Sequence, residues 1–434
     1  HTSDQGEWFK KGEADKSSPY YDYYVWSDSD KKYKDTRIIF LDTEKSSWAW
    51  SEKAQQYYWH RFYSSQPDLN YDNPAVREEM KNIMRFWLDL GIDGFRADAV
   101  PYLFEREGTN CENLPITHAY LKEMRQLVDE EYPECVLLAE ANQWPSDLMP
   151  YFADGDEFHM AFNFPVMPRI YKSVGIGDNS SLLETLKDTP EIPDDCQWCT
   201  FLRNHDELTV EMVTAEDREL LWNIYATEKR MRLNLGIRRR LAPLMNGDMH
   251  KVELLYAILF SLPGVAIIYY GDEIGMGDNI WLPDRDGVRT PMQWANSFHA
   301  GFTNENPDTL YRPVIDTGEY SYEKINVSQQ EEDAESFLNR LKALIQMRKA
   351  HPVFASQEYA IINPEQREIF SIKRSNQYET LICFQNLTNE KQTIDLTQKG
   401  FDVLHTSCEQ IPETKNLSGK ISLQPFDYLW LIQK

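Results

Sequence analysis

Cysteine is scarce in this chain, with six residues among 434. Secreted domains that depend on disulfides carry a far higher density, so a disulfide framework is excluded. Cys196 and Cys199 have the spacing of a redox motif, but no second cysteine pair accompanies them to complete a zinc site. They also lie in the apolar run that leads to Asp206. We therefore expect ordinary reduced thiols.

Positive charge is also in short supply, because 45 Lys and Arg oppose 70 Asp and Glu and give a net charge of −25. Nucleic acid and anionic membrane surfaces would be repelled. No run of eighteen apolar residues is present, which excludes a membrane-spanning helix, and the opening residues do not resemble a secretory leader. These features predict a cytoplasmic protein with a small, neutral partner. A homo-oligomer remains open.

Apolar residues, at 41%, and aromatic residues, at 13%, are abundant, and they are enough for a large core in two or three domains. Residues 1–65 are rich in Tyr, Trp, Asp, Ser and Lys, with short strands expected at 20–26 and 36–41. Residues 66–352 alternate between strand and helix patterns. We expect helices at 74–90, 116–131 and 331–349, and parallel strands at 94–99, 135–141, 158–164, 199–204 and 265–270.

After residue 352 the pattern changes to short β-branched runs separated by Asn, Gln and Gly. Such runs are typical of antiparallel strands. Residues 353–434 are therefore predicted to form a β-sandwich, with strands near 369–372, 380–384, 393–396, 421–423 and 428–432.

Three apolar runs each stop on an acid, at Asp98, Glu140 and Asp206. A buried parallel strand whose carboxyl end opens into an active site has this pattern. A single such acid is as often a helix cap or a solvated loop charge, and Arg96 or His205 alone could be structural. The intervals of about 40 and 65 residues each leave room for whole βα units. Two carboxylates in one cleft are the minimum needed to cleave a glycosidic bond.

The sequence around these acids resembles the α-amylase family of retaining glycosidases. The similar segments are Phe95-Arg-Ala-Asp-Ala99, Ala139-Glu140, Asn204-His-Asp206 and the branch marker Gln66-Pro-Asp-Leu-Asn70. Longer segments resemble the branch of that family that isomerises maltose to trehalose: Phe201-Leu-Arg-Asn-His-Asp-Glu-Leu208, Asn234-Leu-Gly-Ile-Arg-Arg-Arg-Leu-Ala-Pro243, Gly271-Asp-Glu-Ile-Gly-Met-Gly-Asp-Asn279 and Asp284-Arg-Asp-Gly-Val-Arg-Thr-Pro-Met-Gln-Trp294. The resemblance implies a (β/α)8 barrel of the TIM type with a small inserted B domain.

The resemblance also implies a role for each site residue. Asp98 would be the nucleophile, Glu140 the general acid/base and Asp206 the acid that stabilises the transition state. Six further residues would bind the disaccharide, with the last two on the acceptor side: His1, Arg96, Arg203, His205, Glu207 and Arg285. The predicted reaction is intramolecular glucosyl transfer between maltose and trehalose, with some hydrolysis and no organic cofactor.

A structural calcium ion is a further implication of the resemblance, since hard cations take carboxylate and carbonyl oxygens. Its ligands would be Asp42, the carbonyls of Tyr102 and Leu103, and Glu105. Solvated acids without an ion are the alternative at this point.

The chain opens on His1-Thr-Ser-Asp-Gln5, whereas the family has an Asp-x-Val-x-Asn-His segment just before the Thr-Ser-Asp-Gln stretch. We therefore expect the first three barrel strands to lie upstream of His1. Without them the fourth and eighth strands would have unpaired edges, and this chain alone could be inactive.

Two other functions stay open at the level of sequence. One is an α-glucosidase of the oligo-1,6-glucosidase kind, which Arg203 and Glu207 around the third acid disfavour. The other is a non-catalytic barrel used for binding or assembly, which the intact acids disfavour.

Overall fold

The computed structural model describes residues 1–305, 310–411 and 416–433. They form two compact units, which are described separately: unit 1 comprises His1–Phe162 and Glu191–Cys196, and unit 2 comprises Asn163–Pro190 and Gln197–Lys434. Within the described ranges, no helix combines the length and the apolar character that a membrane crossing requires. The predicted division at residues 65 and 352 stays a prediction.

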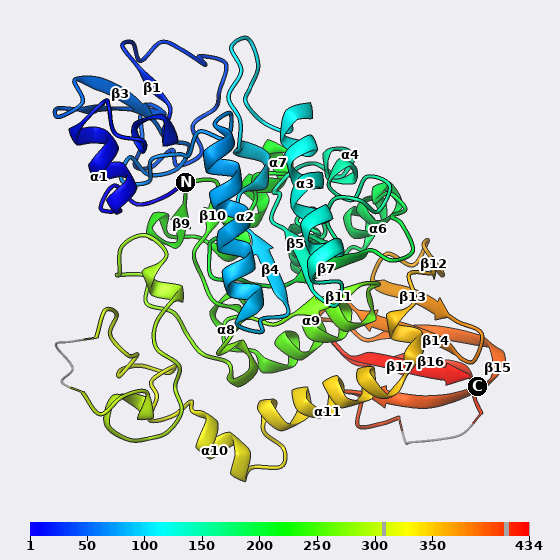
Figure 1. Ribbon diagram of the computed structural model, residues 1–434. Coiled ribbons are helices and arrows are strands. Elements are labelled where there is room, and N and C mark those ends of the chain that lie inside the picture. Colours follow the sequence, from blue (N-terminus) through cyan, green and yellow to red (C-terminus); the bar gives the residue numbers. More distant parts are fainter. Residues whose placement is uncertain (306–309, 412–415, 434) are drawn as a thin grey trace. The chain divides into compact units, whose positions relative to one another are not determined.

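Unit 1 begins with an aromatic segment built around a small antiparallel sheet, ordered β1-β3-β2 (Figure 1). Its elements are α1 (Glu7–Ala14), the 3-10 turn η1 (Tyr21–Tyr23), β1 (Trp26–Ser27), β2 (Trp48–Ser51) and β3 (Gln56–Trp59). The strand predicted at 20–26 is wrong except for its last residue, Trp26, which begins β1. The strand predicted at 36–41 is wrong. The tyrosine and tryptophan rings pack around Phe9 instead, through contacts with Tyr24, Trp26 and Tyr58.

The rest of unit 1 is a run of parallel strands with covering helices. Its elements are α2 (Pro74–Asp89), β4 (Gly94–Ala97), η2 (Val100–Tyr102), α3 (Pro115–Glu131), β5 (Val136–Ala139), α4 (Pro145–Leu148), η3 (Met149–Tyr151) and β6 (Met160–Phe162). The predicted start of α2 is confirmed, because the Asn73 side chain accepts the Ala75 N–H at 2.9 Å and Pro74 occupies the first turn. Strand β5 lies between β4 and β6, and each predicted strand is present in shorter form.

Unit 2 contains the remaining parallel pair, β7 (Gln197–Phe201) and β11 (Val265–Ile267). A small antiparallel sheet, ordered β8-β10-β9, follows β7. The other elements up to residue 301 are α5 (Val166–Ile176), α6 (Ser180–Asp188), β8 (Leu208–Thr209), α7 (Ala215–Tyr225), η4 (Lys229–Met231), β9 (Arg232–Leu233), β10 (Gly236–Ile237), α8 (Leu241–Leu244), α9 (Met249–Ser261), η5 (Asp272–Ile274), η6 (Asp286–Val288) and η7 (Phe298–Gly301).

The helix predicted at 331–349 is two helices, α10 (Val327–Glu332) and α11 (Phe337–Ala350). The break arises because the Ser336 side chain caps α11 by accepting the Asn339 N–H at 3.3 Å, which starts a new helix. A short turn, η9 (Pro352–Ala355), then leads into the C-terminal strands.

The C-terminal part is antiparallel, as predicted, and forms a six-stranded sheet ordered β12-β13-β14-β17-β15-β16. The strands are β12 (Tyr359–Ile361), β13 (Ile369–Ser375), β14 (Thr380–Asn386), β15 (Gln392–Thr406), β16 (Leu417–Leu423) and β17 (Tyr428–Gln433). Strand β15 pairs with β16 through its first half and with β17 through its second, and side chains from both ladders share one core. Buried Glu253 of α9 ties this sheet to the helices by accepting bonds from Tyr428 at 2.9 Å and Arg340 at 2.8 Å.

Candidate active site

The register between β4 and β5 places the first two predicted acids side by side. Ala97 lies opposite Ala139, so Asp98 and Glu140 are the next residues at the carboxyl ends of adjacent strands. The Glu140 N–H continues the ladder by donating to the Ala97 carbonyl at 3.0 Å. Neighbouring strands are only about 5 Å apart. Both carboxyl groups form an ion pair with the same nitrogen of Arg96, so the two groups lie close together.

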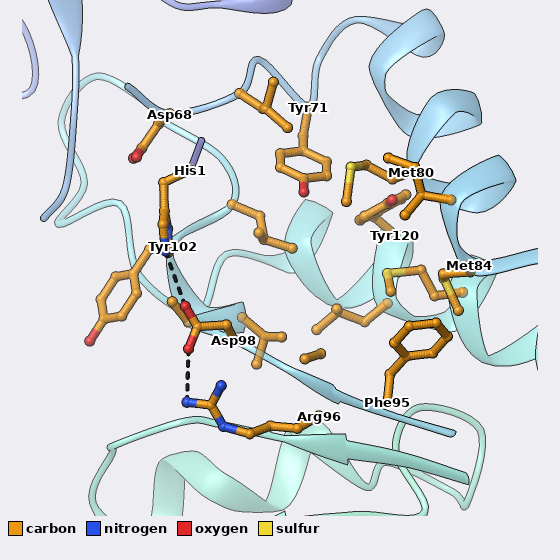
Figure 2. A pocket seen from close by; sticks show the side chains of 18 of the residues that line it. His1, Asp68, Tyr71, Met80, Met84, Phe95, Arg96, Asp98, Tyr102 and Tyr120 are labelled. Carbon is orange, nitrogen blue, oxygen red and sulfur yellow. Dashed lines mark ion pairs between the residues drawn. The ribbon is translucent and has the colours of Figure 1, made fainter. Parts of the chain in front are cut away.

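Arg96 lies on the same face of β4 as Asp98, because side chains two residues apart in a strand share a side. Its Nη2 is 2.9 Å from Asp98 Oδ1 and also forms an ion pair with Glu140. His1 Nε2 lies 3.1 Å from the other oxygen of Asp98. Figure 2 shows Asp98 between Arg96 and His1.

These surroundings separate the acidities of the two carboxyl groups. Burial alone would raise the pKa of Asp98, but hydrogen bonds from His1 and Glu140 and the charge of Arg96 outweigh it and hold the pKa well below its usual range. Burial and the neighbouring Asp98 raise the pKa of Glu140 to about 8, against the lowering effect of Arg96. Near neutral pH, Asp98 is therefore ionised while Glu140 keeps its proton. The Asp98 side chain is 49% exposed and so accessible to a substrate.

Asp68 lies at the same end of a cavity as His1 (Figure 2). It is buried, and burial raises its pKa to about 6 despite the charges of His1 and Arg61. The pKa of His1 is raised because its hydrogen bond to Asp98 and the charges of Asp68 and Asp98 together exceed the effect of burial. Backbone bonds fix this corner, since the Thr2 N–H donates to the Pro67 carbonyl at 2.9 Å. Asp68 thus favours the charged form of His1.

A cavity of about 340 Å³ opens beside Asp98 in unit 1 (Figure 2). Its polar end is formed by His1, Asp68, Arg96 and Asp98. The remaining wall is apolar and aromatic, and includes Tyr71, Met80, Met84, Phe95, Tyr102 and Tyr120.

Behind the acid pair, buried Glu112 connects the aromatic segment to the loop after Glu140. Its carboxylate accepts from Arg37 Nε at 2.8 Å, from Arg61 Nη2 at 2.9 Å and from Gln143 Nε2 at 3.5 Å. Three chain segments distant in sequence therefore meet on one carboxylate, which gives the acid/base loop a rigid support.

In unit 2 the third predicted acid, Asp206, follows β7 in a short loop lined by arginines. Arg289 Nη2 lies 2.6 Å from Asp206 Oδ1, and Arg285 Nε lies 3.0 Å from the same oxygen. His205 Nε2 is 3.4 Å from Oδ2. Arg203 is buried and donates to the Asp206 carbonyl at 2.7 Å, so in this structure it supports the backbone of the acid.

Glu207 and Arg285, predicted on the acceptor side, form a two-point ion pair. Arg285 Nε and Nη2 donate to the two carboxylate oxygens at 2.7 and 3.1 Å, and Asn234 Nδ2 donates to Oε1 at 3.1 Å. Only 11% of the Glu207 side chain and 7% of the Arg285 side chain are exposed. Paired donors of this geometry are stronger and more directional than single hydrogen bonds.

The predicted residues thus form two groups. Unit 1 brings Asp98, Glu140, Arg96 and His1 together, and unit 2 brings together Asp206, His205, Arg203, Glu207 and Arg285. That all three acids share one cleft stays a prediction.

Of the predicted calcium ligands, Tyr102 and Leu103 lie at the turn after Asp98, Glu105 is buried, and Asp42 is on an exposed turn. Over the described part of the chain, no cluster of three or more His, Cys, Asp or Glu side chains could hold a metal. One observation fits an ion: buried Glu105 Oε1 has no hydrogen-bond partner among the described residues. Burial and the nearby charge of Asp68 raise the pKa of Glu105 well above its usual range.

Sequence reasoning missed several contributors. Asp68 and Arg289 lie inside segments that carry the family resemblance, Gln66–Asn70 and Asp284–Trp294, so the motifs contained them without showing their contacts. Glu112 gave no local signal, because its partners come from segments about 50 and 75 residues away.

This chain is similar to several known proteins. The family description "Alpha amylase, catalytic domain" matches residues 1–357. The Trehalose synthase/amylase TreS of Mycobacterium tuberculosis is 53% identical over 91% of this chain and 67% of its own length. The protein of the same name from Mycolicibacterium smegmatis is 48% identical over 99% of this chain and 75% of its own. Maltase A1 of Drosophila melanogaster is 30% identical over 97% and 75%.

Solved structures show the same fold. The crystal structure of an α-amylase from H. orenii matches all of this chain and 78% of its own, with a TM-score of 0.77 at 25% identity.

Proposed function

Because the chain belongs to the α-amylase family and, within it, to the trehalose synthases, we propose that it interconverts maltose and trehalose by intramolecular, retaining glucosyl transfer, with some hydrolysis. The observation that carries this function is the pair of neighbouring carboxyl groups with separated acidities, one ionised and one protonated, at the ends of β4 and β5. Both groups pair with one nitrogen of Arg96, and carboxyl groups this close match a retaining enzyme, since an inverting one needs space for water between them.

In the first step the Asp98 carboxylate attacks the anomeric carbon of the non-reducing glucose of maltose. The bond from that carbon to the glycosidic oxygen breaks, and Glu140 gives its proton to the departing oxygen. The products are a glucosyl ester on Asp98 and a free glucose. Arg96 and His1 keep Asp98 ionised before the attack.

In the second step the free glucose turns within the site, and its anomeric hydroxyl attacks the glucosyl ester. Glu140 now takes the proton of that hydroxyl, and the bond to Asp98 breaks, which gives trehalose. Water attacking in place of the glucose gives hydrolysis, so exclusion of water decides the product.

The third acid and its neighbours would bind the sugar during both steps. We assign Asp206 to the hydroxyls of the transferred glucose, where its charge stabilises the positive transition state. The Glu207–Arg285 pair would bound the space of the released glucose. Its low exposure and two-point geometry suit a fixed wall.

We also propose a structural calcium ion held by Asp42, the carbonyls of Tyr102 and Leu103, and Glu105. The unpartnered, buried oxygen of Glu105 supports it. When bound, the ion would supply positive charge to this oxygen and hold the turn that follows the nucleophile.

The function is tested with Glu140→Gln and α-glucosyl fluoride, whose fluoride leaves without help from an acid. We expect this variant of the full-length protein to lose activity on maltose and to accumulate a glucosyl ester on Asp98, visible by peptide mass spectrometry. Asp98→Asn is the control and should carry no ester. An ester on any other residue, or full maltose activity in either variant, would contradict the assignment.

A further inference from the structure

The loop that carries Arg285 has little regular structure, and its conformation is set by its neighbours in unit 2. The Asn279 N–H donates to the Gly287 carbonyl at 3.0 Å, which closes the loop at its base. A side chain at position 287 would not fit, since a Cβ on Gly287 would lie 2.2 Å from the Asn279 carbonyl oxygen. Asp284, just before Arg285, has a positive φ of 46°. A non-glycine residue keeps that conformation only where its surroundings impose it.

Arg238, directly after β10, makes several side-chain hydrogen bonds to this loop. Its Nη1 donates to the carbonyls of Leu282 and Asp284 at 2.8 and 2.7 Å, and its Nη2 donates to the Ile280 carbonyl at 3.0 Å. Its Nε donates to the Arg230 carbonyl at 2.6 Å. One planar guanidinium therefore fixes three carbonyls of the loop and one of the neighbouring turn. A second contact joins the same segments, since Arg230 lies 3.7 Å over the Trp281 ring.

The β9–β10 hairpin that carries Arg238 also positions the partner of Arg285. Asn234, in the hairpin turn, donates to Glu207 at 3.1 Å. Gly236 of β10 lies under the Glu207 side chain, because a Cβ at this position would be 2.4 Å from Glu207 Cγ. Strand β8, which starts one residue after Glu207, pairs with β10. The hairpin thus contacts both members of the ion pair, Glu207 directly and Arg285 through its loop.

We infer that Arg238 is a positioning residue for the acceptor side: it holds the 280–285 loop on the hairpin, so that Arg285 meets Glu207 and Asp206 at fixed distances and water is kept from the glucosyl-enzyme. This inference rests on the proposed function. Lysine cannot replace Arg238, because a single ammonium on a flexible stem does not reach four carbonyls in different directions. Loss of these bonds leaves Asp98 and Glu140 in place and loosens the wall around the released glucose.

The test compares Arg238→Lys and Arg238→Gln with Arg232→Gln in the full-length protein. Arg232 is the matched control, because it lies on the same hairpin but donates to the Ala226 carbonyl at 2.9 Å and stacks on Trp222, away from the loop. Two readouts are needed: the ratio of trehalose to glucose formed from maltose, and hydrogen exchange of the backbone amides of residues 279–288.

We expect both Arg238 variants to lower the product ratio about tenfold, with kcat for maltose consumption within about threefold of wild type. Exchange in residues 279–288 should rise at least tenfold. Arg232→Gln should change neither readout. Unchanged exchange in Arg238→Lys, or faster exchange with an unchanged product ratio, would overturn the inference. A wild type that forms no trehalose would instead refute the proposed function, and the exchange readout would still report whether Arg238 holds the loop.

Discussion

Glu207→Gln tests whether the acceptor-side ion pair excludes water. The change removes the charge of a carboxylate that accepts two bonds from Arg285 and one from Asn234. Breaking a buried ion pair costs about 3–5 kcal/mol when it leaves an uncompensated charge. Arg285 keeps two other carboxylates, Asp206 at 3.0 Å and Asp284 at 3.1 Å. Its charge stays compensated, and we expect a loss of only about 1–2 kcal/mol in the free energy of unfolding.

The same change should alter the products more than the rate. A glutamine that no longer anchors Arg285 at two points leaves the released glucose less confined. We expect the ratio of trehalose to glucose to fall about tenfold, equivalent to about 1.4 kcal/mol between the two nucleophiles. Consumption of maltose should fall less than threefold, since Asp98 and Glu140 are untouched. Chromatography of maltose reactions over time measures both quantities.

Asp284→Asn is the matched control, because Asp284 contacts the same guanidinium through a side chain that is 36% exposed. A partly exposed pair is worth about 0–1 kcal/mol, so the product ratio should stay unchanged. Lower stability of Glu207→Gln with the wild-type product ratio would refute the reasoning and leave Glu207 a purely structural role.

Three further predictions concern acidity, packing and the ion. Burial and Asp98 raise the pKa of Glu140 to about 8, so activity on maltose should be lost as the pH rises through about 8. The pKa of Asp98 is lowered, so activity should persist at acidic pH to below the usual carboxyl range. A pH–rate profile measures both limits. Gly236→Ala should displace Glu207 and lower the product ratio while kcat for maltose consumption stays within about threefold; an unchanged ratio would show that Glu207 tolerates the added methyl group. Calcium should raise the melting temperature of EDTA-treated protein by several degrees, and Glu105→Gln should abolish that rise; an equal rise in the variant would remove Glu105 from the site.

Strand positions and the local chemistry of the site were accessible from the sequence. Each of the three runs that lead to Asp98, Glu140 and Asp206 contains a parallel strand, β4, β5 or β7. The strand ends made Asp98 and Glu140 candidate acids, and the family resemblance supplied their predicted roles. Residues 20–26 were misassigned because dense aromatic residues satisfy strand propensity and irregular ring packing equally well. The run at 36–41 also has strand propensity, but Arg37 bonds to Glu112 and the Phe40 ring packs on Phe62 and Tyr63 instead.

Contacts between distant segments were not accessible. Glu112 bonds to Arg37 and Arg61, and Arg238 bonds to carbonyls more than 40 residues further along the chain. Such bonds depend on where loops lie in space, and backbone carbonyls leave no trace in the sequence. The break before α11 was missed because residues 331–335 are mostly acidic helix formers. The apolar positions begin only at Phe337, so the cap at Ser336 is the one local sign of a new start.

The central claim is that the glucose released from maltose is the same molecule that attacks the glucosyl-enzyme. The most direct measurement is to incubate the full-length protein with unlabelled maltose and an excess of carbon-13 glucose, and to determine the label content of the trehalose by mass spectrometry. The account predicts trehalose that is almost entirely unlabelled. Trehalose carrying one labelled ring in proportion to the added glucose, or glucose as the sole product, would contradict it.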